Sequence, residues 1–303
     1  MIGNVYRIGT RGSPLALAQA RMVADALGVP SELSIVRTAG DREQRKPLAE
    51  LGGKGVWTKE LERALLDGEI DMAVHSMKDV ESERPSGLFI AAMLPRADVR
   101  DRLIGPVSLD ALRPGMTVGT SSPRRAAQMQ RRVPGLTVIP FRGNVARRLR
   151  RLAENEADAT LLAAAGLDRL GQAGGVAVET TDMLPAPGQG AIGIEVRADN
   201  TELRARLAGL SDAATFTAVS AERAMASALG GSCHSPVAAL AIADGDGFFL
   251  RGEILSLDGQ VMRSGERHFA PRDAARAGDS LGRELLSDAP PEIAALFDGP
   301  PDG

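Results

Sequence analysis

The feature that most constrains the fold is a local pattern that occurs twice. A short apolar segment leads into Gly-Thr, and a Ser-Pro pair then begins a helical run, at Gly9–Pro14 and again at Gly119–Pro123. Ser is a preferred N-cap and Pro is favoured at the first helical position, so both segments predict a strand, a turn and a helix start. A second predicted strand follows each helix, at Leu33–Val36 and at Leu136–Ile139. Two βαβ-rich halves of similar order indicate two α/β lobes that face each other across a cleft.

The pattern changes from Thr215 onward. One amphipathic helix is followed by three strand-like segments, and Asp246-Gly247 and Asp258-Gly259 between them are hairpin signals. A final helix ends near Leu286, and we expect residues 290–303 to be loosely held. The sequence therefore predicts a C-terminal α+β domain with a three-stranded antiparallel sheet.

Polar side chains directly follow the apolar segment Met72–Val74. Ser76, Lys78 and Asp79 come within a few residues of its end. Ligands of open α/β sheets bind beyond the carboxyl ends of the strands, so these groups are expected at a binding crevice. The positive charge of Lys78 favours the ionised form of Asp79. Asp79 is thus a candidate catalytic carboxylate; the alternative is a turn cap beside a solvated Lys78.

The basic residues gather in one part of an otherwise acidic chain. The formal net charge is -3, yet residues 119–153 contain nine Arg and no Asp or Glu. Arg residues also accompany three predicted helix starts, at Ser13, Ser122 and Asn144. Helix N-termini and guanidinium groups both bind carboxylates and phosphates, so a site for a polyanion is predicted. Nucleic acid is disfavoured because only 3% of the residues are aromatic and no helix-turn-helix or zinc signature occurs.

Composition disfavours several other classes. Three isolated His residues and one Cys do not form a metal-binding cluster, so no metal site is expected. A single Cys excludes an internal disulfide. No apolar run approaches the roughly 20 residues that span a bilayer, and Met1–Thr10 lacks signal-peptide architecture, so we expect a cytoplasmic protein without a membrane partner.

Three glycine-containing segments have competing interpretations. The polar stretch 41–56 is predicted to be an active-site lid, with disorder as the alternative. Gly188–Gly193 has Gly-x-Gly-x-x-Gly spacing, but a Pro-rich segment precedes it, so we interpret it as a hinge between domains rather than a dinucleotide site. Cys233 lies among Gly and Ser, where it is either a buried thiol or a nucleophile and covalent attachment point.

Together, these motifs resemble the porphobilinogen deaminase family, also called hydroxymethylbilane synthases. The resemblance extends in order from residue 5 to about residue 290. It is carried by Arg7–Leu17, Gly52–Gly55, Ala73–Asp79, Gly119–Ser122, Arg142–Asn144, Pro187–Gly190 and Gly230–Cys233.

The resemblance implies a fold and a reaction. The first two domains are expected to be periplasmic-binding-protein-like α/β lobes, with domain 1 at residues 1–95 and 191–212, domain 2 at 98–187 and domain 3 at 215–303. The family condenses four porphobilinogen molecules head to tail into hydroxymethylbilane and releases ammonia. It does so on a dipyrromethane cofactor joined to a cysteine by a thioether. The resemblance also suggests that the protein is a monomer.

The resemblance also assigns residues. Asp79 is the expected catalytic residue, and Cys233 is the expected covalent attachment site. Expected cofactor-binding residues are Ser76, Lys78, Thr120, Ser122, Arg124, Arg125, Arg142 and Gly143. Expected substrate-binding residues are Arg11, Ser13, Gln19, Lys54, Trp57, Arg142, Arg148 and Arg169. Three positions depart from many members: Trp57 replaces Phe, Pro123 replaces Leu, and Ser232 adds a residue to the Gly-Gly-Cys loop.

The chemistry of this family is consistent with the residue pattern. Each substrate carries an acetate and a propionate, so a growing chain accumulates carboxylates that suit an Arg-rich cleft. Loss of ammonia leaves positive charge on the pyrrole, which a fixed carboxylate such as Asp79 stabilises. The alternative function is a two-lobed binding module for small dicarboxylates, which needs neither Asp79 nor Cys233.

Overall fold

The computed structural model describes residues 5–38, 57–231, 235–297 and 299. The chain forms two compact units, residues 1–97 with 190–216 (unit 1) and residues 98–189 with 217–303 (unit 2). Among the described residues, none of the helices combines the length and apolar character that a membrane span requires.

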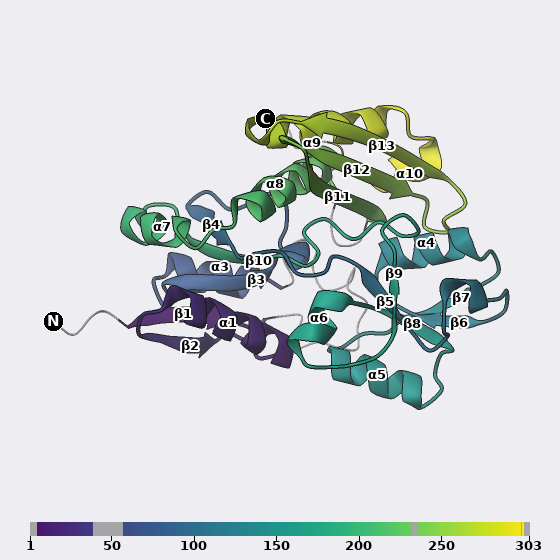
Figure 1. Ribbon diagram of the computed structural model, residues 1–303, viewed down its shortest axis with the longest axis horizontal. Helices are drawn as coiled ribbons and strands as arrows, with labels where there is room; N and C mark the ends of the chain where they lie inside the picture. The colour runs from purple at the N-terminus through teal and green to yellow at the C-terminus, as the bar shows by residue number, and fades with distance from the viewer. Residues whose placement is uncertain (1–4, 39–56, 232–234, 298, 300–303) are drawn as a thin grey trace. The chain divides into compact units, whose positions relative to one another are not determined.

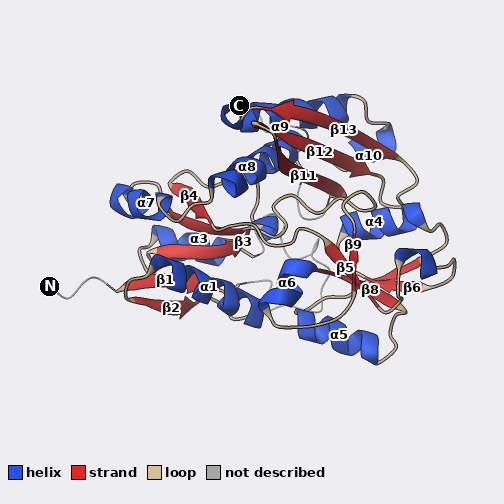
Figure 2. Ribbon diagram, viewed as in Figure 1, coloured by secondary structure: helices blue, strands red, loops and turns tan. Residues whose placement is uncertain are grey.

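Unit 1 is built on a five-stranded sheet with the order β2-β1-β3-β10-β4 (Figures 1 and 2). Strands β1, β2 and β3 are parallel, and β10 lies antiparallel between β3 and β4. The strands are β1 (Tyr6–Thr10), β2 (Ser31–Ile35), β3 (Met72–Ser76), β4 (Leu88–Met93) and β10 (Ile192–Arg197). The helices are α1 (Pro14–Leu27), α3 (Lys59–Leu66), α7 (Thr201–Ala208) and the single 3-10 turn η2 (Met77–Asp79).

Alternation along β3 gives this sheet two apolar faces. Val74 packs with Val23 of α1 and Leu203 of α7 in one buried cluster. Ala73 packs with Leu61 of α3 in the other cluster. Because successive strand residues point to opposite faces, β3 is covered on both sides and its polar residues lie at its carboxyl end.

The first part of unit 2 repeats this plan. Its sheet has the order β7-β6-β8-β5-β9, with β6, β7 and β8 parallel and β5 antiparallel between β8 and β9. The strands are β5 (Asp101–Ile104), β6 (Thr117–Gly119), β7 (Thr137–Ile139), β8 (Ala159–Ala163) and β9 (Val176–Val178). The helices are η3 (Leu109–Ala111), α4 (Pro123–Arg132), α5 (Val145–Ala153) and α6 (Ala164–Arg169). The two predicted α/β lobes are therefore confirmed.

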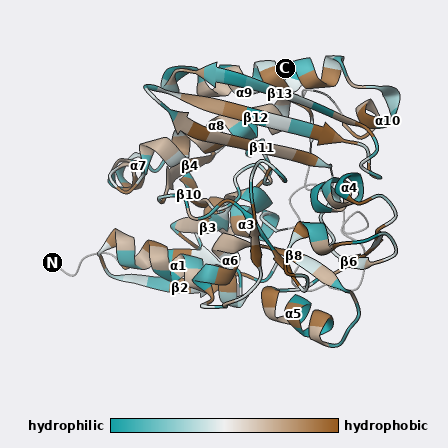
Figure 3. Ribbon diagram, turned by 45° about the vertical axis from the view of Figure 1, so that its right-hand side comes forward, coloured by the Kyte–Doolittle hydropathy of each residue, from teal (hydrophilic) through white to brown (hydrophobic). Residues whose placement is uncertain are grey.

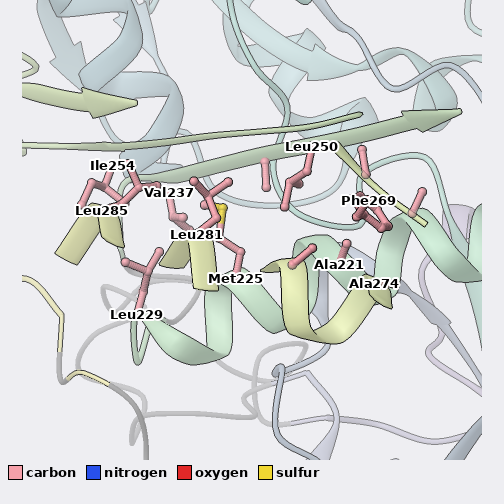
Figure 4. Close-up of a cluster of buried hydrophobic side chains, with 14 of the residues drawn as sticks. Ala221, Met225, Leu229, Val237, Leu250, Ile254, Phe269, Ala274, Leu281 and Leu285 are labelled. Carbon is pink, nitrogen blue, oxygen red and sulfur yellow. The ribbon is translucent and has the colours of Figure 1, made fainter. Parts of the chain in front are cut away.

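The C-terminal part of unit 2 contains the predicted antiparallel sheet, with the order β11-β12-β13. Its elements are α8 (Ala213–Ala228), β11 (Val237–Asp244), β12 (Gly247–Leu255), β13 (Met262–Phe269), η4 (Pro271–Asp273), α9 (Ala274–Ser287) and α10 (Pro291–Ala294). Figure 3 shows β11 in apolar colours and β13 largely in polar ones. Apolar side chains of the sheet, including Leu250 and Ile254, meet Met225 of α8 and Leu281 of α9 in one core (Figure 4).

Two details of the C-terminal part differ from the sequence predictions. Asp244 pairs with Gly247, so the first hairpin loop is Gly245-Asp246, one residue earlier than predicted. Gly245 has a φ of 55°, a value that glycine adopts without strain. The expectation of a loosely held tail is wrong for its first part, because Ile293 is fully buried and Phe297 is 9% exposed within the same core.

The packing of α9 against α8 makes a prediction about Gly278. A Cβ atom at this position would lie 2.0 Å from the carbonyl oxygen of Ala221 and 2.9 Å from Cβ of Ala224. We expect Gly278→Ala to destabilise the protein by about 1–3 kcal/mol despite the better helix propensity of Ala, because the backbones must separate. Calorimetric unfolding measures the loss.

The matched control is Gly209→Ala at the end of α7. Gly209 has a φ of -69°, and its added Cβ meets only an oxygen at 3.6 Å. This variant is expected to be neutral or to gain up to about 1 kcal/mol. Equal stability losses in the two variants would contradict the packing argument.

Candidate active site

The parallel strands of unit 1 place several of the predicted residues at one edge of the sheet. Arg11 and Ser13 follow β1, and Ser76 and Asp79 lie at the carboxyl end of β3, its parallel neighbour. A pocket lies here, which we call the Asp79 pocket. Its lining residues are Arg11, Ser13, Leu15, Ala16, Gln19, Trp57, Thr58, Val74, His75, Ser76 and Asp79. The structure thus brings together six predicted site residues: Arg11, Ser13, Gln19, Trp57, Ser76 and Asp79.

Local contacts fix the walls of the Asp79 pocket. The hydroxyl of Ser13 accepts a hydrogen bond from the Ala16 amide and caps α1. Gln19 Nε2 donates to Ser76 Oγ over 2.7 Å. The guanidinium carbon of Arg11 lies 4.1 Å from the ring centroid of Trp57, a cation–π contact that holds this cation beside the pocket. Asp79 is half-buried on η2, next to Lys78.

A buried charge network supports the β3 side of the pocket. Glu195 Oε2 lies 3.1 Å from His75 Nε2, and Arg84 Nε donates to Glu195 Oε1 over 2.8 Å. Arg84 also donates to Glu62 of α3 over 2.7 Å. Burial pushes the pKa of Glu195 upward, but its contacts with His75 and Arg84 outweigh burial and lower this pKa to about 2. The network joins β3, β10 and α3 behind the pocket.

Unit 2 gathers basic and hydroxyl groups at the carboxyl ends of its own parallel strands. Thr120 and Ser122 follow β6, and Arg142 and Gly143 follow β7, its parallel neighbour. Ser122 caps α4, and Asn144 caps α5. Arg148 Nε donates to the Gly143 carbonyl over 3.0 Å. Arg169 ends α6, the helix that follows β8, and burial lowers its pKa.

Arg124 and Arg125 are held by a carboxylate that lies outside the Arg-rich segment. Arg124 Nη2 donates to Asp101 Oδ2 over 2.8 Å, and Arg125 Nη2 donates to Asp101 Oδ1 over 2.7 Å. Gln189 Nε2 donates to the same Oδ1 over 2.9 Å. Burial alone raises the pKa of Asp101, yet the two guanidinium groups hold it well below its usual range. We call Asp101, Arg124, Arg125, Gln128 and Gln189 the Asp101 cluster.

The two arginines of the Asp101 cluster differ in how their donors are used. Arg124 Nη1 donates to Gln128 and to the Leu184 carbonyl over 2.9 and 2.8 Å, so both terminal nitrogens are engaged. Arg125 makes one side-chain hydrogen bond to the described residues, the one to Asp101. Figure 3 shows α4 mostly in polar colours although both arginines are buried, with exposures of 3% and 5%.

The donors that remain in this region suit a carboxylate-rich cofactor. Within the described part of the chain, Nε of Arg124, Nε of Arg125 and Oγ of Ser121 are buried without a hydrogen-bond partner. Two guanidinium groups share Asp101, and Glu253 also faces Arg124 and accepts a hydrogen bond from Gln128. Anionic acceptors fit such a set of hydroxyl and guanidinium donors. The described residues contain no group of three or more His, Cys, Asp or Glu side chains placed to hold a metal ion.

Some predicted positions lie outside the described residues. These are Cys233, Lys54 and the whole of the predicted lid stretch 41–56.

Sequence reasoning missed Asp101, Glu195 and Thr58. Asp101 lies 23 positions before Arg124 and 24 before Arg125, and Glu195 lies 120 positions after His75, so no local pattern connects the partners. The strands β5 and β10 bring these acids into place by antiparallel pairing across the fold. Thr58 had a local signal, since it directly precedes the helical run of α3 beside Trp57.

The sequence matches two protein-family models and several known proteins. Residues 6–205 match the family model described as porphobilinogen deaminase, dipyromethane cofactor binding domain, and residues 216–287 match the model of the C-terminal domain of porphobilinogen deaminase. A porphobilinogen deaminase of Sphingopyxis alaskensis is 51% identical over 97% of both chains. That of Paracoccus denitrificans is 47% identical over 96% of both chains.

The Asp101 cluster predicts a large effect of Asp101→Asn. The substitution keeps the shape but leaves two buried guanidinium groups without their shared carboxylate. We expect a loss of about 3–5 kcal/mol of stability, measured by calorimetry. The control is Asp168→Asn. The ion pair of Asp168 with Arg102 is largely exposed, so this substitution should lower the stability by less than about 1 kcal/mol. Similar losses at both sites would contradict the assigned role of Asp101.

The Glu195 network predicts acid sensitivity in unit 1. The folded pKa of Glu195 is about 2, below its ordinary value of 4.5. Its contribution is therefore fully present above about pH 4.5 and is lost as the pH falls toward 2, for a total of about 3 kcal/mol. Fluorescence of Trp57, the single Trp, reports urea unfolding of this unit at each pH.

Glu195→Gln should flatten this pH dependence between pH 5 and pH 2. Asp199→Asn, which removes an exposed partner of Arg197 in the same unit, is the matched control and should leave the curve unchanged. A Glu195→Gln curve that still follows the unsubstituted protein would show that Glu195 does not cause the acid sensitivity.

Proposed function

This chain belongs to the porphobilinogen deaminase family, the hydroxymethylbilane synthases, and we propose how its residues perform the reaction of that family. The enzyme is a transferase of tetrapyrrole biosynthesis that condenses four porphobilinogen molecules head to tail into hydroxymethylbilane and releases ammonia. It uses a dipyrromethane cofactor. The observation that carries the assignment of residues is the Asp79 pocket, where a half-buried carboxylate and an arginine line one cavity.

Asp79 acts as the catalytic carboxylate in this proposal. When the amino group of the substrate's aminomethyl arm leaves as ammonia, the methylene carbon stays on the ring, positive charge develops on the pyrrole, and a fixed carboxylate stabilises this charge. The same carboxylate accepts the proton that a second pyrrole releases when its ring carbon forms a bond to this methylene carbon. Rigid placement on η2, at the end of a strand covered on both faces, avoids a large reorganisation during the reaction.

Arg11 and Ser13 orient the carboxylates of the incoming substrate. Arg11 is held against Trp57, and Ser13 begins α1, whose N-terminus carries partial positive charge. Gln19 positions Ser76 by its 2.7 Å hydrogen bond. Lys54, Arg142, Arg148 and Arg169 are the other proposed substrate ligands.

The cofactor is proposed to be joined to Cys233 by a thioether. When bound, it supplies the pyrrole carbon to which the first substrate unit is added. Its acidic side chains are bound by Arg125 and by the hydroxyls of Thr120 and Ser122, because Nε of Arg125 is a buried donor without a partner among the described residues. Arg124, Arg142, Gly143, Ser76 and Lys78 complete the proposed cofactor site.

The binding-module alternative is disfavoured by the family assignment and by the carboxylate in the pocket. A receptor for dicarboxylates gains nothing from Asp79 beside its ligand, since like charges repel. We also propose a monomeric enzyme of the cytoplasm, as the family resemblance and the sequence composition suggest.

The test compares intact masses of three purified proteins. The unsubstituted chain should carry extra mass equal to two condensed porphobilinogen units, and Cys233→Ser should lack it. Asp79→Asn should retain the extra mass yet lose more than about 99% of its turnover, because the substitution removes the negative charge that stabilises the transition state.

Incubation with porphobilinogen distinguishes a protein that was purified without its cofactor from a protein that lacks the proposed function. An unsubstituted chain that stays unmodified and consumes no porphobilinogen contradicts the function. Full turnover by Asp79→Asn contradicts only the role of Asp79.

A further inference from the structure

The Asp79 pocket contains a polar atom that no family motif in the sequence identified. Thr58 lines the pocket and is 1% exposed, yet its hydroxyl has no hydrogen-bond partner among the described residues. A buried hydroxyl without a partner destabilises a protein, and in native structures such an atom needs a ligand, a water molecule or a functional explanation.

The usual structural role of a Thr at this position is not fulfilled. Thr58 is the N-cap of α3 (Lys59–Leu66), but its side chain makes no capping hydrogen bond. Its carbonyl begins the helix by accepting from the Glu62 amide over 2.8 Å. The hydroxyl is therefore not needed to start the helix and is available to the pocket that it lines.

The surroundings of Thr58 favour an anionic partner. Arg11 lines the same pocket and lies on Trp57, the residue before Thr58. The pocket is also lined by the beginnings of two helices, α1 at Ser13–Ala16 and α3 at Thr58, and helix N-termini carry partial positive charge. Glu60 and Glu62 lie in the first turn of α3, where Arg84 pairs with Glu62. Asp79 is the acidic residue that lines the pocket itself.

We infer that the Thr58 hydroxyl donates a hydrogen bond to a side-chain carboxylate of the pyrrole bound in the Asp79 pocket. Thr58 is thus a substrate-binding residue that works beside Arg11. The inference rests on the proposed function, because it takes porphobilinogen as the ligand of this pocket. The Thr58 hydroxyl is a neutral donor beside Arg11. It distinguishes a carboxylate from an uncharged substituent of the pyrrole ring at this position of the Asp79 pocket.

The inference predicts opposite effects of Thr58→Val on binding and on stability. Val has nearly the same shape but lacks the hydroxyl, so the KM for porphobilinogen should rise about three- to tenfold while kcat changes little. The melting temperature should stay constant or rise, because an unpaired buried hydroxyl is replaced by an apolar group. Thr58→Ser keeps the donor and should restore the KM to within about twofold.

Thr215→Val is the matched control in the same unit. Thr215 is 4% exposed, and its hydroxyl accepts a hydrogen bond from the Arg96 amide over 3.0 Å. Its removal takes the acceptor from the part-buried Arg96 amide and a hydrogen-bond partner from Asp212, so the melting temperature should fall by roughly 2–4 °C while the KM stays unchanged.

The outcomes separate the inference from the proposed function. An unchanged KM in Thr58→Val, or a fall in melting temperature like that of Thr215→Val, overturns the role of Thr58 while turnover by the unsubstituted enzyme still supports the function. Failure of Thr58→Ser to restore the KM also overturns it. Absence of porphobilinogen consumption by the unsubstituted enzyme overturns the proposed function and this inference together.

Discussion

Burial of charge beside the sheets is the constraint on which the rest of this structure depends. Each α/β sheet accepts one antiparallel strand next to its three parallel strands, and that strand carries a buried carboxylate. In unit 1, Glu195 of β10 binds His75 and Arg84; in unit 2, Asp101 of β5 binds Arg124 and Arg125. A buried ion is tolerated only when it is paired and hydrogen-bonded, so the antiparallel strands fix these basic groups in place.

This arrangement explains why the chemistry lies at the carboxyl edges. The parallel strands are short, and the segments that follow them carry helix starts, hydroxyls and cations. Ser13 begins α1 after β1, and Ser122 begins α4 after β6. One local pattern therefore places helix N-termini at the carboxyl edge of the sheet in each lobe, and in unit 1 Asp79 on η2 adds a carboxylate to the pocket at that edge.

The sequence was sufficient for features with a local cause. The two Ser-Pro helix starts and the three strands of the C-terminal sheet each depend on a few neighbouring residues, and the structure confirms them. Of the six predicted residues in the Asp79 pocket, Ser76 and Asp79 were predicted from their place after a strand, and Arg11 and Ser13 from a helix start. Gln19 and Trp57 were predicted only from the family resemblance. Partners of charges were not predictable in this way, because Asp101 and Glu195 reach theirs through strand pairing over long sequence separations. The acid-free segment 119–153 therefore suggested more unpaired positive charge than the fold contains.

Buried donors without partners connect stability with function in both units. Thr58 Oγ1 in the Asp79 pocket and Nε of Arg125 in the Asp101 cluster lack acceptors within the described residues. Each such atom destabilises the folded chain relative to a fully paired interior. An anionic ligand that supplies acceptors removes this cost only in the folded state, and therefore shifts the equilibrium toward that state. The same donors need no rearrangement when the ligand arrives. Donors that were already paired within the protein would first have to break those hydrogen bonds, so a preorganised site binds at a lower cost in free energy.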